Sequence, residues 1–237
     1  VKREYFLGCY VKWQCVSILL YADDIIIIAP TVMALQKLLE IVELELELLD
    51  MQINSRKSSC MRIGPRFNSD CAVIHTRDGR ELQWTTEIRY LGVYLIAGKL
   101  FTCSFSAAKR SFYRSFNGIF SKVGRRASEE VILELVKKKC MPQMLYGLDA
   151  CPVNKTQIQS LQFAVTGMLM KTFNTKLKDI VDMCSVYFHF DTVNVCILKR
   201  KHNFLLRFGD TKNVLCHVFS DIVNSELYNV TIRPKNC

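Results

Sequence analysis

The run VSILLYADDIIIIAP, residues 16–30, constrains the fold more than any other stretch of the sequence. Val16–Leu20 and Ile25–Ala29 are β-branched and aliphatic, which predicts two buried strands that meet at a tight turn. Asp23 and Asp24 would then lie at the tip of a hairpin. Two neighbouring carboxylates repel each other unless water or a bound cation neutralises them. The hairpin is therefore a candidate metal site.

Oxygen-only ligands of this kind favour Mg²⁺ or Mn²⁺. A pair of such ions can clamp the attacking and leaving oxygens of a phosphoryl transfer. A bare Asp-Asp dipeptide is weak evidence, because aspartate is common in surface turns. The apolar strands on both sides and the preceding Tyr21-Ala22 make the pattern much more specific.

Charge is unevenly distributed along the chain, whose formal net charge is +10. Residues 1–104 carry 12 Lys and Arg against 12 Asp and Glu, whereas residues 105–237 carry 20 against 10. A basic half suits a polyanion such as nucleic acid, or an anionic membrane surface, through counterion release and long-range attraction. A basic surface that only confers solubility is the alternative.

The 11 cysteines are scattered, odd in number and never spaced as Cys-x-x-Cys. This usage favours reduced thiols in an intracellular protein, in the cytoplasm or the nucleus. No apolar run reaches the roughly 20 residues needed to cross a bilayer, so we expect no membrane span. The chain begins with Val1 and enters strand-like sequence almost at once, so we expect a fragment of a longer protein.

One helix and further strands are predicted after the acid hairpin. Thr31 is a plausible N-cap, and apolar residues at helical spacing continue to about Met51. Asp78-Gly79 supplies the positive φ angles of a primed hairpin turn. Residues 87–95 read as a strand with Gly92 in its interior, where a glycine marks a bulge or the close approach of another backbone or a ligand.

From Ser104 onward the pattern is helical. The predicted helices are 108–123, one that starts after Ser128 and kinks or ends at Pro142, one capped by Asn154, and 193–208, stopped by Gly209. The sequence therefore predicts an α+β fold. Residues 1–103 would hold antiparallel hairpins and one helix, and residues 104–237 would form a basic helical unit.

Several motifs occur in an order that resembles one family. YADD followed by IIIIAP resembles the catalytic hairpin of reverse transcriptases, in particular those encoded by non-LTR retrotransposons of the jockey and chicken-repeat kind. LLDMQINSRKS resembles the helix-to-strand segment that carries a lysine, IRYLGVYL the primer-grip hairpin, and MLYGLDACPVNKTQIQSL a stretch of the helical region after the palm. The resemblance extends from about Gly8 to about residue 218.

The resemblance implies a partial palm, with the YADD hairpin and the primer-grip strands, over residues 1–103. A thumb and C-terminal region would follow over residues 104–237. In the complete enzyme it implies two-metal nucleotidyl transfer with Mg²⁺ or Mn²⁺. The partners would be an RNA template, a DNA primer and deoxynucleoside triphosphates.

Residue roles follow from the same resemblance. Asp23 would bind the catalytic metals and Asp24 would assist, while Tyr21 and Ala22 would lie beside the primer end. Lys57 matches a lysine proposed to protonate the departing pyrophosphate. The alternative for Lys57 is a solvated lysine in a polar turn.

Other matched positions would contact nucleic acid. Leu91 and Gly92 match the primer-grip turn, where a missing side chain lets the primer backbone approach; an ordinary strand bulge is the alternative. Phosphate-contacting candidates on the thumb are Arg125, Arg126, Lys137, Lys138 and Lys139. Each of these basic residues could also be only a solvated charge.

The chain also departs from the family pattern. The polymerase site needs a further aspartate from an earlier palm strand, and no aspartate precedes Asp23. Fingers are missing too, so we expect no polymerisation by this chain alone, and a non-enzymatic nucleic-acid-binding remnant is the alternative. Asp50 and Lys12-Trp13 stand where the family usually has glycine in a turn, and a left-handed Asp50 would cost about 1 kcal/mol.

Overall fold

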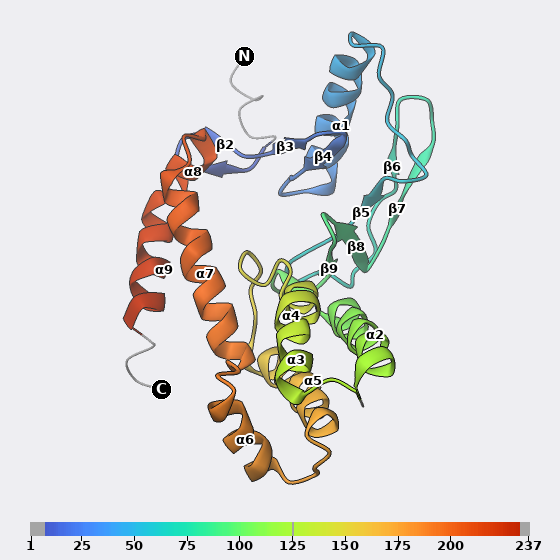
Figure 1. The fold of residues 1–237 in the computed structure, drawn as a ribbon. Helices are drawn as coiled ribbons and strands as arrows, with labels where there is room; N and C mark the ends of the chain where they lie inside the picture. The colour runs from blue at the N-terminus through green and yellow to red at the C-terminus, as the bar shows by residue number, and fades with distance from the viewer. Residues whose placement is uncertain (1–7, 125, 233–237) are drawn as a thin grey trace. The chain divides into compact units, whose positions relative to one another are not determined.

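The computed structural model describes residues 8–124 and 126–232, which form two compact units (Figure 1). The first unit comprises Val1–Ile88 and Ile96–Phe101, and the second comprises Arg89–Leu95 and Thr102–Cys237. Residues 89–95 were expected in the first part of the chain but group with the second unit. Helices and small sheets are both present, which confirms the α+β class.

The first unit contains small sheets and one long helix, α1 (Val32–Glu47). Strand β1 (Tyr10–Val11) pairs with β2 (Gln14–Cys15), β3 (Ile18–Tyr21) pairs with β4 (Asp24–Ile27), and β7 (Glu81–Trp84) lies between β5 (Ser59–Cys60) and β6 (Ile74–His75). Its small core consists of Leu39, Cys60, Ile74 and Leu82, with Ile27, Val32, Leu35, Ile53 and Trp84 packed against them.

Helix α1 begins at a side-chain N-cap and is followed by a residue in the left-handed conformation. Thr31 is the N-cap, and its side chain accepts a hydrogen bond of 3.1 Å from the backbone N–H of Ala34. The helix ends at Glu47, a few residues before the expected Met51, and Asp50 follows with φ of +54°. The predicted left-handed conformation of Asp50 is therefore confirmed.

Strands β3 and β4 are less buried than expected. The side chains of Leu20 and Tyr21 are 71% and 61% exposed, so the prediction of two buried strands was wrong. Within the described residues β3 and β4 pair only with each other, and Ile27 is the strand residue that packs against the small core. A two-stranded ribbon covered on one side leaves its other apolar side chains in water.

The two later hairpins also differ from expectation. Residues 87–95 form β8 (Glu87–Tyr90), a two-residue turn at Leu91-Gly92, and the start of β9 (Val93–Ile96). The single strand predicted from the residues alone was wrong, whereas the turn at Leu91-Gly92 that the resemblance implied is present. Strand β9 pairs also with β10 (Thr102–Ser104). In the β6–β7 loop only Gly79 has positive φ, which excludes the expected primed two-residue turn.

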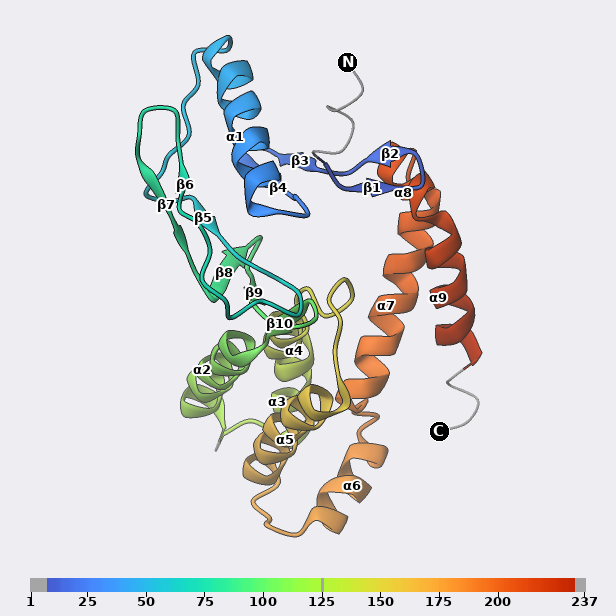
Figure 2. The same cartoon turned by 180° about the vertical axis from the view of Figure 1, so that it is seen from behind.

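The second unit is largely helical, as Figure 2 shows from behind. Its elements after β10 are α2 (Ser106–Val123), α3 (Glu129–Leu135), the π-helix η2 (Val136–Cys140), α4 (Met141–Met144), α5 (Lys155–Thr172), α6 (Lys178–Tyr187), α7 (Val193–Asp210), α8 (Val214–Val218) and α9 (Ser220–Ile232). Helices α6, α8 and α9 were not predicted, and α7 runs through Gly209. None of the described helices combines the length and apolarity that crossing a membrane requires.

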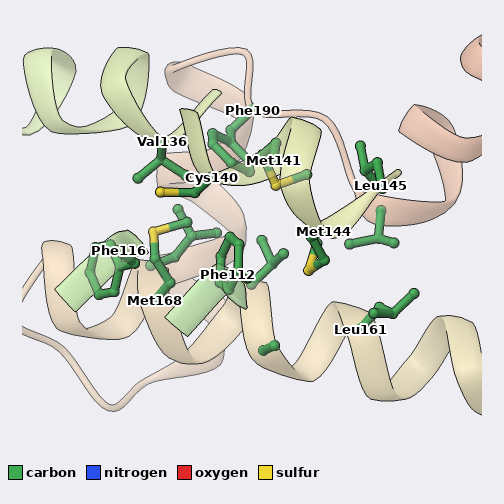
Figure 3. Close-up of a cluster of buried hydrophobic side chains, with 14 of the residues drawn as sticks. Phe112, Phe116, Val136, Cys140, Met141, Met144, Leu145, Leu161, Met168 and Phe190 are labelled. Atoms are coloured by element: carbon green, nitrogen blue, oxygen red, sulfur yellow. The ribbon is translucent and has the colours of Figure 1, made fainter. Parts of the chain in front are cut away.

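The larger core of the protein lies among α2, α4 and α5. Phe112 and Phe116 of α2 are buried, and they share one cluster with Met144 of α4 and with Leu161 and Met168 of α5 (Figure 3). The predicted apolar stripe of residues 108–123 therefore faces the core. Burying each of these side chains contributes about 1.5–3 kcal/mol of hydrophobic stabilisation.

Pro142 neither ends the helix nor leaves it regular. A proline has no backbone N–H, and its ring clashes with the carbonyl of the residue four positions earlier, here Lys138. The chain widens into the π-turn η2 immediately before it, and the backbone N–H of Met141 bonds to the carbonyl of Val136, five residues back. The helix then continues through α4, and this widened turn carries the Lys137–Lys139 run.

Candidate functional site

The acid pair lies at the tip of the β3–β4 hairpin. Tyr21 pairs with Asp24 in the antiparallel register, which leaves Ala22 and Asp23 as the two turn residues. Ala22 has φ of +54°, a conformation that glycine adopts more easily than alanine. Asp23 is therefore a turn residue and Asp24 is the first residue of β4.

Both carboxylates are open to solvent. Tyr21, Ala22, Asp23 and Asp24 are all exposed. Within residues 8–124 and 126–232, neither aspartate side chain takes part in a hydrogen bond or an ion pair. As far as the described residues go, these two adjacent charges are left to be neutralised by water or by a cation from solution.

A buried serine holds the start of this hairpin. Ser17 directly precedes β3 and is only 1% exposed. Its Oγ accepts a hydrogen bond of 2.6 Å from the backbone N–H of Cys9, and its carbonyl accepts one of 2.7 Å from the N–H of Ile28. The backbone of Ser17 therefore joins the two strand ends at the base of the hairpin, and its side chain ties this base to the segment at Cys9.

The acid pair fits a hard divalent cation only in part. Oxygen atoms are the ligands that Mg²⁺ and Mn²⁺ prefer, and an octahedral ion takes about six, of which carboxylates supply a few and water or substrate phosphate the rest. Among the described residues no group of three or more His, Cys, Asp or Glu side chains could hold a metal ion. Asp23 and Asp24 therefore have the right chemistry but do not complete a site alone.

Lys57 lies in an exposed turn of the first unit. Its backbone N–H bonds to the carbonyl of Asn54 at 3.0 Å, and the Asn54 side chain also caps this turn. Ile53 and Cys60, on either side, pack in the same small core as Ile27 of β4. The shared core fixes both segments, but no hydrogen bond or ion pair joins Lys57 to either aspartate in the described structure.

The Leu91-Gly92 turn belongs to the second unit and borders a cleft. Both turn residues have positive φ, +46° and +81°. The hydroxyl of Tyr146 donates a hydrogen bond of 3.0 Å to the carbonyl of Leu91. A cleft of about 540 Å³ adjoins the turn, and Arg89 and Gln143 are among the residues that line it together with Gly92 and Tyr146.

The three lysines of η2 have different surroundings. Lys137 is half-buried; its Nζ lies 3.1 Å from a Glu134 carboxylate oxygen and donates to the carbonyl of Phe188 at 3.2 Å. The hydrogen bond from Lys137, aided by its charge, holds the pKa of Glu134 below its ordinary value. Lys138 and Lys139 are exposed, and Nζ of Lys138 lies 3.6 Å from the other Glu134 carboxylate oxygen. Both present charge to the solvent, whereas Lys137 mainly ties elements together.

The remaining basic candidates follow α2. Arg126 is exposed in the turn between α2 and α3, where its backbone N–H bonds to the carbonyl of Val123. Arg125 lies outside the described residues. The first unit therefore contains the acid hairpin and Lys57, and the second contains the Leu91-Gly92 turn and the described basic candidates.

Two contributing residues were not predicted from the sequence. Ser17 could have been found, because a single polar residue within an apolar run signals a buried hydrogen bond. Tyr146 occurs in MLYGLDA, which served only as a landmark. Nothing local in that motif indicates a bond to a residue 55 positions earlier in the chain.

One comparison with known protein families gives a match. The family model described as "Reverse transcriptase (RNA-dependent DNA polymerase)" matches residues 5–95. The matched segment contains Asp23, Asp24 and Lys57 and ends before the helices of the second unit. No curated protein matches the chain. The match supports a reverse transcriptase.

Proposed function

We propose that this chain is part of an RNA-directed DNA polymerase of the non-LTR retrotransposon kind and supplies two of its metal-binding carboxylates. The observation that carries the proposal is the YADD turn, with both aspartates exposed at a hairpin tip inside the segment that matches the reverse transcriptase model. The non-LTR origin rests on the order of the further motifs.

Each matched residue would have a defined task in the complete enzyme. Bound Mg²⁺ or Mn²⁺ would neutralise charge on the reacting phosphate and activate the primer hydroxyl. The Asp23 carboxylate would bind these metal ions and Asp24 would assist, and the Lys57 ammonium would give a proton to the leaving pyrophosphate. Tyr21, Ala22, Leu91 and Gly92 would bind the primer strand of an RNA–DNA duplex.

We infer that these 237 residues do not polymerise alone. No aspartate precedes Asp23, and the described residues offer no third acid beside the pair. A two-metal site lacking a shared ligand positions its ions poorly, and misplacement of the reacting atoms by about 1 Å can cost 10²-fold in rate.

The second candidate function is nucleic-acid binding without catalysis. It is favoured by the charge of residues 105–237, which have 20 Lys and Arg against 10 Asp and Glu. Such a surface attracts phosphates without reading sequence. On this alternative the acid pair is a relic and its replacement changes no activity.

Primer extension separates the two candidates. The purified chain, given an RNA template, a DNA primer, deoxynucleoside triphosphates and Mg²⁺, is expected to incorporate nothing. A chimera that adds the fingers and first palm strands of an active reverse transcriptase is expected to extend the primer. Asp23→Asn should abolish this extension, because it removes a charged ligand.

Asp70→Asn is the matched control, since Asp70 is an exposed loop aspartate of the same unit. It should leave extension by the chimera unchanged. Extension that persists in the Asp23→Asn chimera would contradict the assignment of the acid pair. Extension by the unmodified chain alone would contradict its proposed dependence on a further carboxylate.

A further inference from the structure

We propose that Tyr146 is a positioning residue that holds the Leu91-Gly92 turn in its nucleic-acid-binding conformation. The inference rests on the proposed role of that turn in contacting the primer. Tyr146 lies between α4 and α5 in a segment matched by no family model, and all residues of the contact belong to the second unit.

Tyr146 meets the turn through both its hydroxyl and its ring. The hydroxyl donates to the carbonyl of Leu91 at 3.0 Å. A Cβ placed on Gly92 would lie 3.1 Å from Cε1 of the Tyr146 ring, closer than ordinary van der Waals contact. The ring therefore packs on a surface that only glycine leaves open, and the hydroxyl fixes the preceding peptide.

The turn that Tyr146 contacts is strained. Leu91 has φ of +46°, which is costly for a residue with a Cβ atom. Gly92 has no Cβ atom and adopts its φ of +81° without that cost. A strained residue keeps its conformation only where the surroundings determine it. The hydrogen bond from Tyr146 is made to the carbonyl of Leu91 itself, so it acts on the strained residue directly.

Tyr146 is itself firmly anchored. Its neighbours Leu145 and Leu148 are buried in the large core. Gly147 has φ of +74°, and a Cβ there would lie 2.7 Å from Cγ2 of Val93. The segment around Tyr146 therefore touches the hairpin at three successive residues, from Leu91 to Val93.

Burial does not explain why residue 146 is a tyrosine. Its side chain is 56% exposed and forms part of the wall of the cleft beside the turn. A core role would favour phenylalanine or leucine, whereas the hydroxyl reaches one specific carbonyl. The result is that Leu91, 43% exposed, is presented to solvent on a fixed backbone.

The test uses the full chain with Tyr146→Phe, which removes only the hydroxyl. Amide hydrogen exchange at residues 91–93 is expected to become several-fold faster, because the strained turn opens more often. The dissociation constant for an RNA–DNA primer–template duplex is expected to rise about threefold to tenfold, the effect of losing one hydrogen bond. Tyr187→Phe is the control, because Tyr187 is exposed and its hydroxyl bonds to nothing in the described residues.

A second variant tests the strain. Asparagine adopts the left-handed conformation more readily than leucine. In Leu91→Asn/Tyr146→Phe, exchange at residues 91–93 should therefore return toward the wild-type rate. If Tyr146→Phe acted only by loosening the packing, Leu91→Asn would not slow the exchange again. An exchange rate that stays fast in the double variant therefore overturns the strain argument.

The outcomes distinguish this inference from the proposed function. An unchanged rate of amide hydrogen exchange in Tyr146→Phe overturns the proposal that the Tyr146 hydroxyl holds the turn. Faster exchange with unchanged duplex affinity overturns the positioning role. If the wild-type chain fails to bind the duplex at low salt, the proposed nucleic-acid contact of the turn fails, and the positioning role fails with it.

Discussion

The backbone conformations of Asp50 and Lys12 could be predicted from the sequence. Both were expected in turns that usually carry glycine, and both have φ of +54°. The resemblance placed both at turn positions where the family usually has glycine, the residue that adopts positive φ most easily. Leu91 adopts the same region, but its strain was not foreseen, because the primer-grip resemblance placed a turn at Leu91-Gly92 and assigned the unusual conformation to the glycine alone.

Asp50→Gly should therefore stabilise the first unit. Glycine adopts positive φ without the Cβ clash, so the free energy of unfolding should rise by about 0.5–1 kcal/mol. Urea denaturation monitored by the fluorescence of Trp84, which packs on the small core, would measure the change.

Asp70→Gly is the control for this substitution, because Asp70 has an ordinary negative φ. It should leave stability unchanged or lower it slightly. If Asp50→Gly also leaves the free energy of unfolding unchanged or lowers it, the left-handed conformation at position 50 does not cost significant stability.

Cysteine reactivity at different pH should also separate individual residues. The Ser17 hydroxyl lowers the pKa of the exposed Cys15 thiol, whereas burial raises the pKa of Cys60 and of Cys140 to about 11. The thiolate is the reactive form, so Cys15 has more of it at neutral pH. Mass spectrometry after brief iodoacetamide treatment at pH 7.5 should find Cys15 modified well before Cys60 and Cys140.

The expected rate at Cys15 rises with pH and levels off once its lowered pKa is passed. The two buried thiols should react in the native protein only at strongly alkaline pH. Equal modification of all three at pH 7.5 would contradict the burial of Cys60 and Cys140. After unfolding in urea their rates should converge.

At the scale of elements, a side-chain cap did not by itself decide which helices could be predicted. Helices α2 and α3 were predicted although they lack a capping side-chain hydrogen bond, and α8 was missed although Asn213 caps it. Thr31 and Asn154 each cap a helix through a hydrogen bond. Helix α6 begins after Leu177, which offers no cap, and it was not predicted. Gly209 was expected to end α7, but the helix continues because Gly209 does not take the left-handed conformation that a glycine stop requires.

Asn154→Ala tests the cap of α5. The Asn154 side chain accepts from the N–H of Gln157 at 2.8 Å, and the Gln157 side chain accepts from the Asn154 N–H at 3.0 Å. Losing this capping box should cost about 1 kcal/mol and lower the melting temperature by about 2–4 °C. Asn154→Ser keeps an accepting oxygen and should retain most of the stability in a thermal melt.

At the scale of the whole molecule, the order of the motifs predicted a reverse transcriptase, which the family match over residues 5–95 supports. The nucleic-acid partner that the basic composition indicates stays a prediction. The contacts between distant segments could not be predicted. The bond from Tyr146 to Leu91 and the packing of Ile27 with Cys60 depend on which elements become neighbours. Hydrophobic periodicity tells which face of an element is buried but not what covers it, so the exposure of Leu20 was also missed.

The basic half of the chain predicts a salt-dependent affinity for duplex nucleic acid. Lys138→Ala/Lys139→Ala removes two exposed charges from η2. If both bind phosphates, the slope of log affinity against log salt should become shallower by about 2. Fluorescence anisotropy over a salt series measures it for a labelled RNA–DNA duplex.

Lys176→Ala/Lys178→Ala is the matched pair, since both lysines are exposed near the start of α6. This variant has the same net charge as the η2 variant. An equal change of slope in both would show that binding follows total charge and has no preferred place on the second unit.

Within the part of the chain that the structure describes, β3 and β4 form a sheet of their own, and this bears on the stability of the acid turn. A two-stranded ribbon is only marginally stable in water, so we expect the tip that carries the acids to fray more readily than the end that packs on the core through Ile27. Any cation or strand that binds only the ordered form stabilises it by mass action. If Asp23 and Asp24 bind a metal as proposed, its affinity and the local folding of the hairpin would form one linked equilibrium, and the apparent affinity would be reduced by the fraction of hairpins that are frayed.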